Sequence, residues 1–492
     1  MVKTAQIALL PDRKYAQINL QDEALLRKLN KLLSYREPGS EFSPQARNFG
    51  WSGIINLMNK KCQFPLGLLD MVKLFLVENG YTFDIIDRQL IVESAQPIDI
   101  SGRLVDLKKI PRYYQIEAAK KAIEHNRGIL KLTTGAGKSL LAAIITAELN
   151  KPTNIFVIGL DLLSQFHSLF SEIFDEEIGY IGNGVCEIRR INIISLWTAA
   201  KSIDPAKKIK IEDDEDGSKE KFNDSDASKI LEAIKKAKVI MFDECHSAST
   251  ESFKKLYSKI NPEYLYGLSG TPFKMEATDI LIKGLLGNII VDIKASELIE
   301  KGYLVKPVIK FFQVPKMHIE NKTYVGVYKE YVVENKVRND IIVSSTKKLV
   351  DAGYQTLVLF RQIAHGKNLL EMLKSQGINA EMLSGNDKLE KRENVKERLL
   401  SGQLNCIVAS SVFDIGVDIS SLNALVLASP NKSLIRALQR IGRVIRSHPG
   451  KKDVRVVDFW DEALYLKSHS KRRYNIYKQE DGFEVILPKG IK

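Results

Sequence analysis

The stretch Ile129-Leu-Lys-Leu-Thr-Thr-Gly-Ala-Gly-Lys-Ser139 joins an apolar, strand-like run to a glycine-rich turn, and an apolar helical pattern over residues 140–147 follows directly. This order is typical of a P-loop, in which backbone N–H groups surround a phosphate at the N-terminus of a helix. The chain departs from the strict pattern at Leu132, because glycine or alanine is usual five residues before Gly137. The stretch predicts a nucleoside triphosphate ligand, but other motifs must decide against an accidental match.

The residues of the turn have different roles in this hypothesis. Lys138 can reach the outer phosphates, and the Ser139 hydroxyl can bind Mg²⁺. The expected nucleotide-binding residues are Thr134, Gly135, Ala136, Gly137, Lys138 and Ser139. The sequence therefore predicts Mg²⁺ as the metal cofactor, with Ser139 as one ligand.

A second cluster of polar residues, Met241-Phe-Asp-Glu-Cys-His246, follows an apolar run that reads as a strand. Asp243 can hold Mg²⁺ through water, and Glu244 can orient and deprotonate an attacking water. His246 can couple these carboxylates to their surroundings. Such a pair after a strand is common by chance, but here it lies between the P-loop and Ser269-Gly-Thr-Pro272.

A helix is expected to begin in Ile110-Pro-Arg-Tyr-Tyr-Gln-Ile-Glu-Ala-Ala119, ahead of the P-loop. The Gln115 amide can both donate and accept a hydrogen bond, which suits the N6/N7 edge of adenine, and Arg112 or Tyr113 could stack on the ring. These residues favour ATP as the nucleotide. A lone glutamine is usually a surface residue, so the prediction depends on its position before the P-loop.

Strand-like runs alternate with helical patterns after the P-loop, which predicts a parallel α/β sheet. The expected strands are 154–158, 191–195, 238–242 and 264–268. Between Lys201 and Ser228 the pattern fails and acidic residues dominate, so we expect a surface insertion there. An acidic insertion could oppose nucleic acid, although a solvated loop is the more ordinary interpretation.

A second α/β unit without a P-loop follows residue 307. Its expected strands are 355–360, 379–383, 405–409, 424–428 and 454–458. It contains Gln439-Arg-Ile-Gly-Arg-Val-Ile-Arg446, where Arg443 and Arg446 are three residues apart on one helical face. Two such arginines suit the charge that develops on a γ-phosphoryl group.

Length and composition indicate several globular domains. The 492 residues are 44% hydrophobic, enough for about three domains of roughly 150 residues. The first ten residues show no signal-peptide pattern, and no apolar run approaches the ~20 residues that span a bilayer, so we expect a cytoplasmic protein. The four cysteines form no C-x-x-C pair, and we expect buried thiols.

The basic excess is confined to the last part of the chain. Residues 301–492 carry 33 basic and 20 acidic side chains, whereas residues 1–300 are balanced. A solvated basic surface and a surface that follows a polyphosphate backbone both agree with this imbalance.

Residues 1–98 lack catalytic motifs and are expected to form a small α+β accessory domain. Residues 66–77 have a helical pattern, and Phe42-Ser-Pro-Gln-Ala-Arg-Asn-Phe-Gly-Trp-Ser-Gly-Ile54 reads as an aromatic and glycine-rich turn. Trp51 within it is either a core residue, which is the commoner case, or a surface on which bases stack.

The motifs together resemble the superfamily 2 helicases, because Gly-Ala-Gly-Lys-Ser, Asp-Glu-Cys-His, Ser-Gly-Thr and Gln-x-x-Gly-Arg-x-x-Arg occur in that family's order. The resemblance implies two tandem RecA-like lobes, residues 105–300 and 301–492. The residues implied for ATP hydrolysis are Lys138, Ser139, Asp243, Glu244, Gln439, Arg443 and Arg446. Ser269 and Thr271 would couple the lobes, and Gly416 and Asp418 would contact nucleotide.

Within that family the chain looks most similar to the UvsW-type recombination helicases of tailed phages. Phe42-Ser-Pro44, Gly50-Trp-Ser-Gly53 and Pro65-Leu-Gly67 resemble the accessory domain of that group. The DNA contacts implied are Gln165, Ser195, Thr198, Ser384, Gly385, Ser410 and Trp51. Ile158-Gly159 and Ser410-Ser411 depart from the usual Pro-Thr and Thr-Asp, and both departures fall on implied nucleic-acid or interlobe contacts.

The resemblance implies an ATP-dependent helicase that acts on branched DNA as a monomer, with no membrane partner. An RNA helicase or another nucleic-acid-dependent ATPase of the superfamily is the main alternative. A scaffold that binds nucleic acid without hydrolysis conflicts with the intact Lys138, Asp243 and Glu244. A motor subunit of a restriction enzyme would need a nuclease centre, and no carboxylate–lysine cluster outside the lobes suggests one.

Overall fold

The structure is a computed structural model that divides into two compact units. One unit comprises Met1–Leu132 and Gly137–Asp292, and the other comprises Thr133–Ala136 and Ile293–Lys492. The residues described are 3–37, 40–42, 50–89, 93–204, 220–246, 251–273, 277–384, 387, 389–410, 421–430, 441–442, 444–448 and 450–491.

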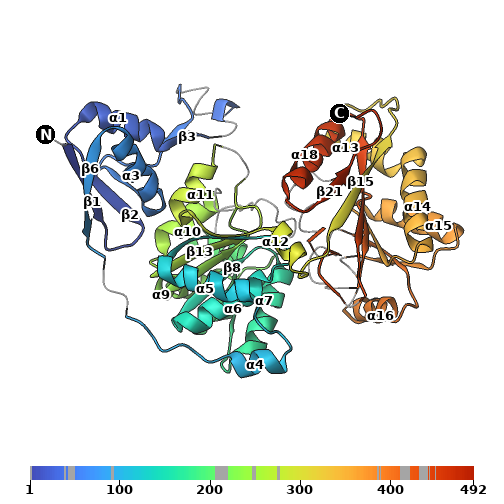
Figure 1. The fold of residues 1–492 in the computed structure, drawn as a ribbon, viewed down its shortest axis with the longest axis horizontal. Coiled ribbons are helices and arrows are strands. Elements are labelled where there is room, and N and C mark those ends of the chain that lie inside the picture. Colours follow the sequence, from blue (N-terminus) through green and yellow to red (C-terminus); the bar gives the residue numbers. More distant parts are fainter. Residues whose placement is uncertain are drawn as a thin grey trace. The chain divides into compact units, whose positions relative to one another are not determined.

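Residues 3–87 of the first unit form a small α+β module (Figure 1). Its elements are β1 (Lys3–Leu9), β2 (Tyr15–Asn19), α1 (Glu23–Leu32), β3 (Ser34–Arg36), β4 (Ile54–Asn56), β5 (Gln63–Pro65), the 3₁₀ turn η2 (Leu66–Leu68), α3 (Leu69–Glu78) and β6 (Tyr81–Asp87). The sheet order is β5-β2-β1-β6, with only the β1–β6 pair parallel. Asp22 caps α1 by accepting a hydrogen bond from the Leu25 N–H at 2.9 Å, and the apolar faces of α1 and α3 pack into one core with the sheet.

The rest of the first unit, residues 93–132 and 137–292, belongs to lobe 1 and contains a largely parallel sheet. Its strands are β7 (Arg127–Leu132), β8 (Thr153–Val157), β9 (Gly179–Gly182), β10 (Val185–Glu187), β11 (Ile191–Ser195), β12 (Val239–Asp243), β13 (Tyr264–Ser269) and β14 (Ile289–Ile293). The order is β10-β9-β11-β8-β12-β13-β7-β14. Every residue of β8, β11, β12 and β13 is buried, as expected for central parallel strands that helices cover on both faces.

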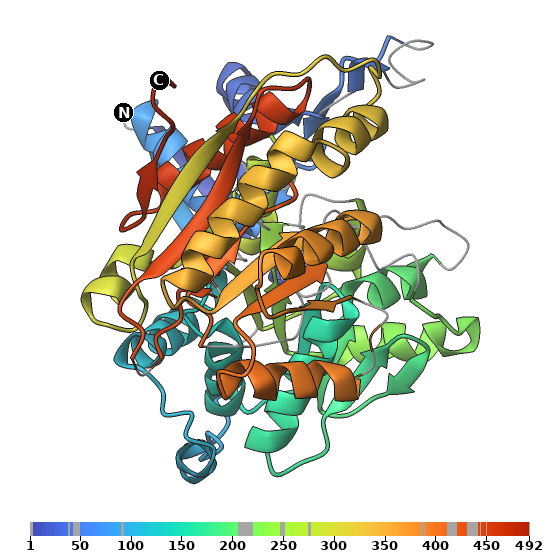
Figure 2. The ribbon, with the colours of Figure 1, turned by 90° about the vertical axis from the view of Figure 1, so that its right-hand side faces the viewer.

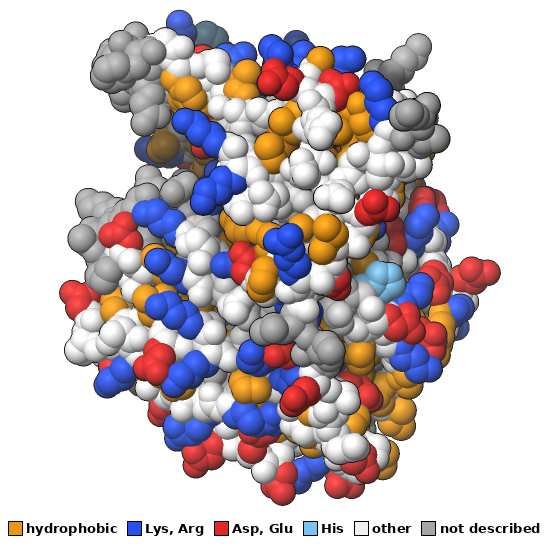
Figure 3. All heavy atoms as spheres, turned by 90° about the vertical axis from the view of Figure 1, so that its left-hand side faces the viewer, with side chains coloured by type: hydrophobic (Ala, Val, Ile, Leu, Met, Phe, Trp, Pro, Cys, Tyr) orange, Lys and Arg blue, Asp and Glu red, His pale blue; other side chains and the backbone are white. Residues whose placement is uncertain are grey.

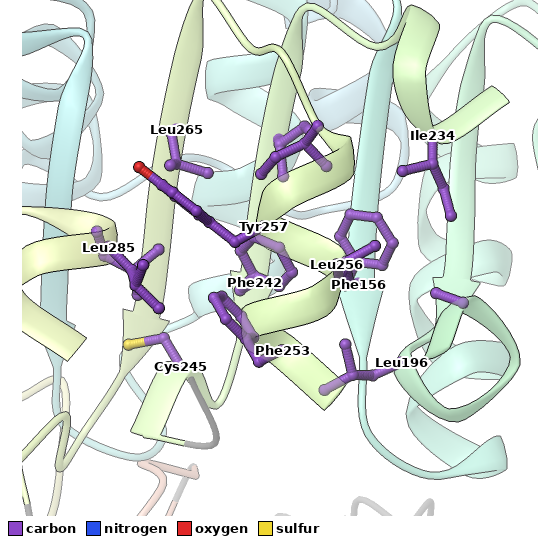
Figure 4. Close-up of a cluster of buried hydrophobic side chains, with 14 of the residues drawn as sticks. Phe156, Leu196, Ile234, Phe242, Cys245, Phe253, Leu256, Tyr257, Leu265 and Leu285 are labelled. Carbon is purple, nitrogen blue, oxygen red and sulfur yellow. The ribbon is translucent and has the colours of Figure 1, made fainter. Parts of the chain in front are cut away.

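The helices of lobe 1 are α4 (Ser101–Asp106), α5 (Tyr113–His125), α6 (Lys138–Leu149), α7 (Leu160–Ile173), α8 (Leu196–Ile203), α9 (Ala227–Lys236), α10 (Glu251–Lys259) and α11 (Asp279–Leu286). Side chains from α8 to α11 share one apolar cluster with the sheet. In Figure 4, Phe253 lies beside Phe242, and the Tyr257 hydroxyl projects from the edge of the cluster. That hydroxyl is therefore available for a polar contact outside the core.

The second unit contains lobe 2, whose sheet has the order β17-β18-β16-β19-β20-β15-β21. Its elements are α12 (Ala295–Glu300), β15 (Pro307–Val314), α13 (Tyr324–Tyr328), the π-helical turn η6 (Lys329–Val333), α14 (Lys336–Asp351), β16 (Thr356–Phe360), α15 (Ile363–Ser375), β17 (Ala380–Leu383), α16 (Leu389–Leu400), β18 (Cys406–Ser410), β19 (Ala424–Val426), β20 (Val454–Asp461), α18 (Leu466–Gln479) and β21 (Glu484–Ile486). The long strands β15 and β20 run side by side and parallel (Figure 2). The predicted α/β class with parallel sheets is confirmed.

Buried polar contacts fasten α14 and α15 within lobe 2. The Arg338 guanidinium donates to the Asp461 carboxylate at 2.9 Å, and both side chains are fully buried. His365 on α15 lies 2.9 Å from the Asn339 Oδ1, so its Nε2–H is the donor. Burial, together with the neighbouring Arg338 charge, lowers the pKa of His365 to about 3. His365 is therefore neutral in the folded chain at neutral pH.

The bounds expected for the surface insertion, Lys201 and Ser228, are wrong, because residues at both ends of it belong to the folded lobe. Helix α8 continues to Ile203. Ser202 within this helix is buried, and its hydroxyl donates a hydrogen bond to the Ala199 carbonyl. After the undescribed residues, Glu220 is only 6% exposed and Phe222 packs against the lobe 1 core. The polar and charged sequence of this stretch did not indicate that Ser202 and Glu220 have buried hydrogen-bond partners. The cysteine expectation is half correct, since Cys245 and Cys406 are buried whereas Cys62 and Cys186 are only partly so.

Two features of the described residues concern membranes and surface charge. Among the described residues, no helix is both long and apolar enough to span a bilayer. On the face shown in Figure 3, Lys and Arg side chains are interspersed with Asp and Glu. That face therefore presents no field of one sign.

Candidate active site

The P-loop of lobe 1 joins β7 to α6, as the sequence predicts. Gly137 is the residue before α6 and has a φ of 80°, in the left-handed region that glycine adopts at no steric cost. A Cβ at this position would lie 2.4 Å from the Gln115 Nε2. Gly137 is therefore required by the turn, and its lack of a side chain also leaves room for the Gln115 amide.

The Gln115 side chain is directed at the P-loop in this structure. It is 2% exposed, its Nε2 donates to the Gly137 carbonyl at 3.2 Å, and its Oε1 accepts from the Arg112 N–H at 2.9 Å. These contacts make Gln115 a support for the turn. Contact with adenine by Gln115 or Arg112 stays a prediction.

Glu244 is the centre of the polar contacts beside the P-loop. Its Oε1 accepts from the Lys138 Nζ at 2.8 Å, while its Oε2 accepts from the Ser269 Oγ at 3.2 Å. The His246 Nδ1 lies 3.4 Å from the same Oε2. Because Ser269 Oγ also accepts from the Thr271 N–H at 3.2 Å, the Ser-Gly-Thr segment is bonded to the carboxylate that the sequence assigns to water activation.

Local backbone geometry produces this arrangement. β12 ends at Asp243, and Glu244 adopts a φ of 50°, which is unusual for a residue with a side chain. The change of direction allows both consecutive carboxylates to remain buried at the carboxyl edge of the sheet. Asp243 is 5% exposed and Glu244 is 8% exposed.

The two carboxylates have opposite electrostatic environments. Burial raises the pKa of Asp243, and the negative Glu244 adds to the effect although Lys138 opposes it. Burial would also raise the pKa of Glu244, but Lys138 and His246 outweigh burial and hold it below its ordinary value. Burial lowers the pKa of Lys138, but the Glu244 and Asp243 charges more than compensate, so its pKa is raised. Lys138 and Glu244 are therefore both charged at neutral pH.

Comparison with known families identifies the chain. Residues 8–87 match the family "DNA helicase UvsW, N-terminal", residues 108–274 match "Type III restriction enzyme, res subunit", and residues 334–448 match "Helicase conserved C-terminal domain". ATP-dependent DNA helicase uvsW of Enterobacteria phage T4 is 27% identical over 483 residues, which cover 92% of this chain and 90% of the relative. The chain is a superfamily 2 DNA helicase that resembles the UvsW type. The predicted family is confirmed.

Further similarities agree with this assignment. Helicase 22 of the Sulfolobus islandicus filamentous virus (isolate Iceland/Hveragerdi) is 28% identical over 405 residues, covering 76% of this chain and 68% of the relative. The solved structure of S. cerevisiae Dbp5 bound to RNA and ADP BeF3 has 13% identity and a TM-score of 0.51, and the match covers 80% of this chain and 94% of that chain. The Dbp5 similarity concerns the fold alone.

Two predicted DNA-contact residues of this UvsW-like helicase are bonded inside lobe 1. Ser195 caps α8, and its Oγ donates to the Glu220 carboxylate at 2.8 Å. The Thr198 hydroxyl donates to the same carboxylate, and all three side chains are buried. Gln165 on α7 is exposed, and Trp51 in the accessory module is half-buried.

The structure describes only part of the predicted site in lobe 2 of the helicase. Gly385, Gly416, Asp418, Gln439 and Arg443 lie outside the described residues. Arg446 is half-buried and forms a backbone bridge with Leu304. Ser410 ends β18 and is 5% exposed, whereas the Ser384 hydroxyl donates to Asp387 at 3.0 Å.

The sequence analysis missed the Ser269 contact with Glu244 and the support of the P-loop by Gln115. Each joins residues far apart in the chain, so periodicity contains no signal for it. The sequence analysis also missed Arg127, the first residue of β7, whose contacts are described below.

Proposed function

We propose that this ATP-dependent DNA helicase acts on branched DNA, driving branch migration, fork regression and unwinding in recombination, repair or replication. The observation that carries the proposal is the Lys138–Glu244–Ser269 cluster of hydrogen bonds in a chain that also has a UvsW-type module. The cluster supplies the groups for hydrolysis, and the module supplies a second surface for DNA. The domains that we propose from the sequence are the accessory domain 1–98, lobe 1 at 105–300 and lobe 2 at 301–492, whereas the compact units of the structure divide between Asp292 and Ile293.

The residues of lobe 1 fit a magnesium ion. Asp243 Oδ1 is buried without a hydrogen-bond partner among the described residues, and carboxylate and hydroxyl oxygens are ligands that Mg²⁺ prefers. Magnesium in a nucleotide site is commonly held by one or two protein ligands together with the phosphates. Asp243 and Ser139 would hold Mg²⁺, which neutralises charge on the phosphates.

The chain's own groups then divide the work of hydrolysis. Lys138 binds the outer phosphates, and the backbone from Thr134 to Gly137 surrounds them. Glu244 orients the attacking water and accepts its proton. Lys138 and His246 lower the pKa of Glu244, so its carboxylate is ionised in the folded chain. Ser269 and Thr271 link the state of Glu244 to the segment that follows β13. Arg443 and Arg446 supply positive charge from lobe 2, with Gln439, Gly416 and Asp418 completing the nucleotide site.

We propose DNA contacts at Gln165, Ser384, Gly385, Ser410 and Trp51, as the resemblance implies. Ser195 and Thr198 are buried and donate to the Glu220 carboxylate, so in this structure they are not placed to contact DNA. The basic excess of residues 301–492 favours lobe 2 as the source of backbone attraction. We expect a monomer to act on DNA in the cytoplasm.

The test is ATP-dependent unwinding of forks, four-way junctions and linear duplexes of equal length by the full chain. Faster unwinding of forks and junctions supports the proposal, and equal rates would contradict it. ATP hydrolysis measured with DNA and with RNA separates the alternative of an RNA helicase, which predicts stronger stimulation by RNA.

A further inference from the structure

The accessory module packs directly against lobe 1, and each contributes side chains to the apolar core of the other. Tyr35 of β3 is 6% exposed and belongs to the lobe 1 cluster, with Ile55 and Leu57 of the module packed against it. In the other direction, Ile280 of α11 packs against the module's own cluster. The buried apolar surface therefore runs continuously from the module to lobe 1.

A close backbone approach fixes the centre of this docking surface. Gly67 in η2 faces α11, and a Cβ at Gly67 would lie 2.2 Å from the Lys283 carbonyl oxygen and 2.6 Å from that of Gly284. A Cβ at Gly284 would touch Leu68 and Pro65 at 3.4 Å. The φ of Gly67 is outside the left-handed region, so glycine is needed here for the approach to lobe 1 and not for the local turn.

Polar contacts tie the same surface to the strand that leads to the P-loop. Arg127 begins β7, and its guanidinium donates to the carbonyl oxygens of Arg13 in the module and of Leu285 in α11. It also donates to the Tyr257 hydroxyl at 3.3 Å, which in turn donates to the Lys14 carbonyl at 3.3 Å. This is the hydroxyl that projects from the cluster in Figure 4. Asn288 adds a 2.7 Å hydrogen bond to Asp70 of α3.

We propose that the accessory module is a fixed part of lobe 1, docked through Gly67, Arg127 and Tyr257, and that this docking transmits ATP-driven movement to a DNA branch held by the module. The inference rests on the proposed action on branched DNA. Arg127 is a positioning residue, since it contacts the module at one end of β7 while the P-loop follows the other end. A module that is only tethered would hold a branch without a fixed distance from the motor.

The substitution Gly67→Ala separates docking from folding. Its methyl group clashes with lobe 1 backbone, and the nearest atoms it meets all belong to lobe 1. The matched control is Gly102→Ala, because Gly102 also has an ordinary φ and a Cβ there meets nothing within 4 Å. A milder pair is Tyr257→Phe, which removes a docking hydroxyl, and Tyr266→Phe, which removes a buried hydroxyl bonded to Ala122 within lobe 1 at 2.7 Å.

The experiment measures three properties of each full-length variant: amide hydrogen exchange, ATP hydrolysis stimulated by linear single-stranded DNA, and unwinding of four-way junctions. Gly67→Ala should raise exchange in residues 63–69 and 279–288, keep ATP hydrolysis within about 2-fold of wild type, and lower junction unwinding about 10-fold to 100-fold, as expected when a reacting group is misplaced. Tyr257→Phe should shift all three properties in the same direction by less. Both controls should resemble wild type.

Two results would overturn the inference. One is raised exchange at both surfaces with junction unwinding unchanged, and the other is unchanged exchange in Gly67→Ala, which would mean that the methyl group does not separate the module. Failure of the proposed function has a different signature, namely a wild-type chain that unwinds junctions no faster than linear duplexes while the exchange measurements still report docking.

Discussion

The Lys138–Glu244 ion pair predicts that removing the catalytic base tightens nucleotide binding. The Nζ and Oε1 atoms are 2.8 Å apart, and the side chains are 14% and 11% exposed. A charge-assisted hydrogen bond of this kind contributes about 1.5–3 kcal/mol, and Lys138 must weaken it to contact a phosphate. Glu244→Gln leaves a weaker neutral hydrogen bond to Lys138. We therefore expect ATP binding to become more favourable by about 1–2 kcal/mol, which lowers the Kd about 5-fold to 30-fold. Turnover should fall to background, because glutamine cannot accept the proton of water.

The assay is equilibrium binding of ATP with Mg²⁺ by titration calorimetry, alongside measurement of phosphate release. Glu263→Gln is the matched control, because Glu263 forms a 2.8 Å ion pair with Lys151, with side chains 19% and 13% exposed. That control should lose stability without a change in nucleotide affinity. Lys138→Ala should lose both binding and turnover. Unchanged or weaker ATP binding by a folded Glu244→Gln chain would refute the reasoning.

Three further predictions concern lobe 2 and the charge balance. His365 has a pKa of about 3 in the folded chain against an ordinary value of 6.5. The unfolded chain therefore binds more protons, and the free energy of unfolding falls as the pH drops below 6.5. Between pH 7.5 and 5.5 this group alone should lower the free energy of unfolding by about 1.4 kcal/mol, and chemical denaturation should find this loss absent in His365→Gln. Arg446→Ala should lower turnover about 10³-fold while ATP affinity changes little, and equal loss of binding and turnover would disprove a role confined to the transition state. DNA affinity should fall with salt by about 0.9 in log K per log salt for each duplex phosphate contacted, and a salt-insensitive affinity would remove the polyphosphate-following interpretation of residues 301–492.

The sequence predicts the motor core well because its signals are local. β11 occupies residues 191–195 as expected, and α6 follows the P-loop where its apolar spacing indicated a helix. The apolar runs before Asp243 and Ser269 end in strands whose carboxyl ends meet at one edge of the sheet. Periodicity and motif order suffice for these elements because each is defined by a short window of sequence.

Other features escaped prediction because they depend on distant partners. β15 begins with Pro307 and contains Lys310, and it is absent from the strands expected in this unit, although it pairs with β20 along its whole length. Glu220 reads as part of an acidic loop, yet hydroxyls from Ser195 and Thr198 make its burial favourable. The need for glycine at position 67 has no signal in the neighbouring sequence, because the clash that Gly67 avoids is with residues more than two hundred positions later.

The shared core of the module and lobe 1 has a consequence for exchange of parts between related helicases. Tyr35 belongs to a cluster in lobe 1, and Ile280 packs against one in the module. A chimaera junction in the linker near residue 98 would therefore separate residues that share these two cores. A chimaera made at that point would join surfaces that have not adapted to each other. A cut at the boundary near residue 292, where the compact units separate, would transfer α10 and α11 together with the module that packs on them. Recombination among relatives should therefore preserve the module and lobe 1 as one inherited block.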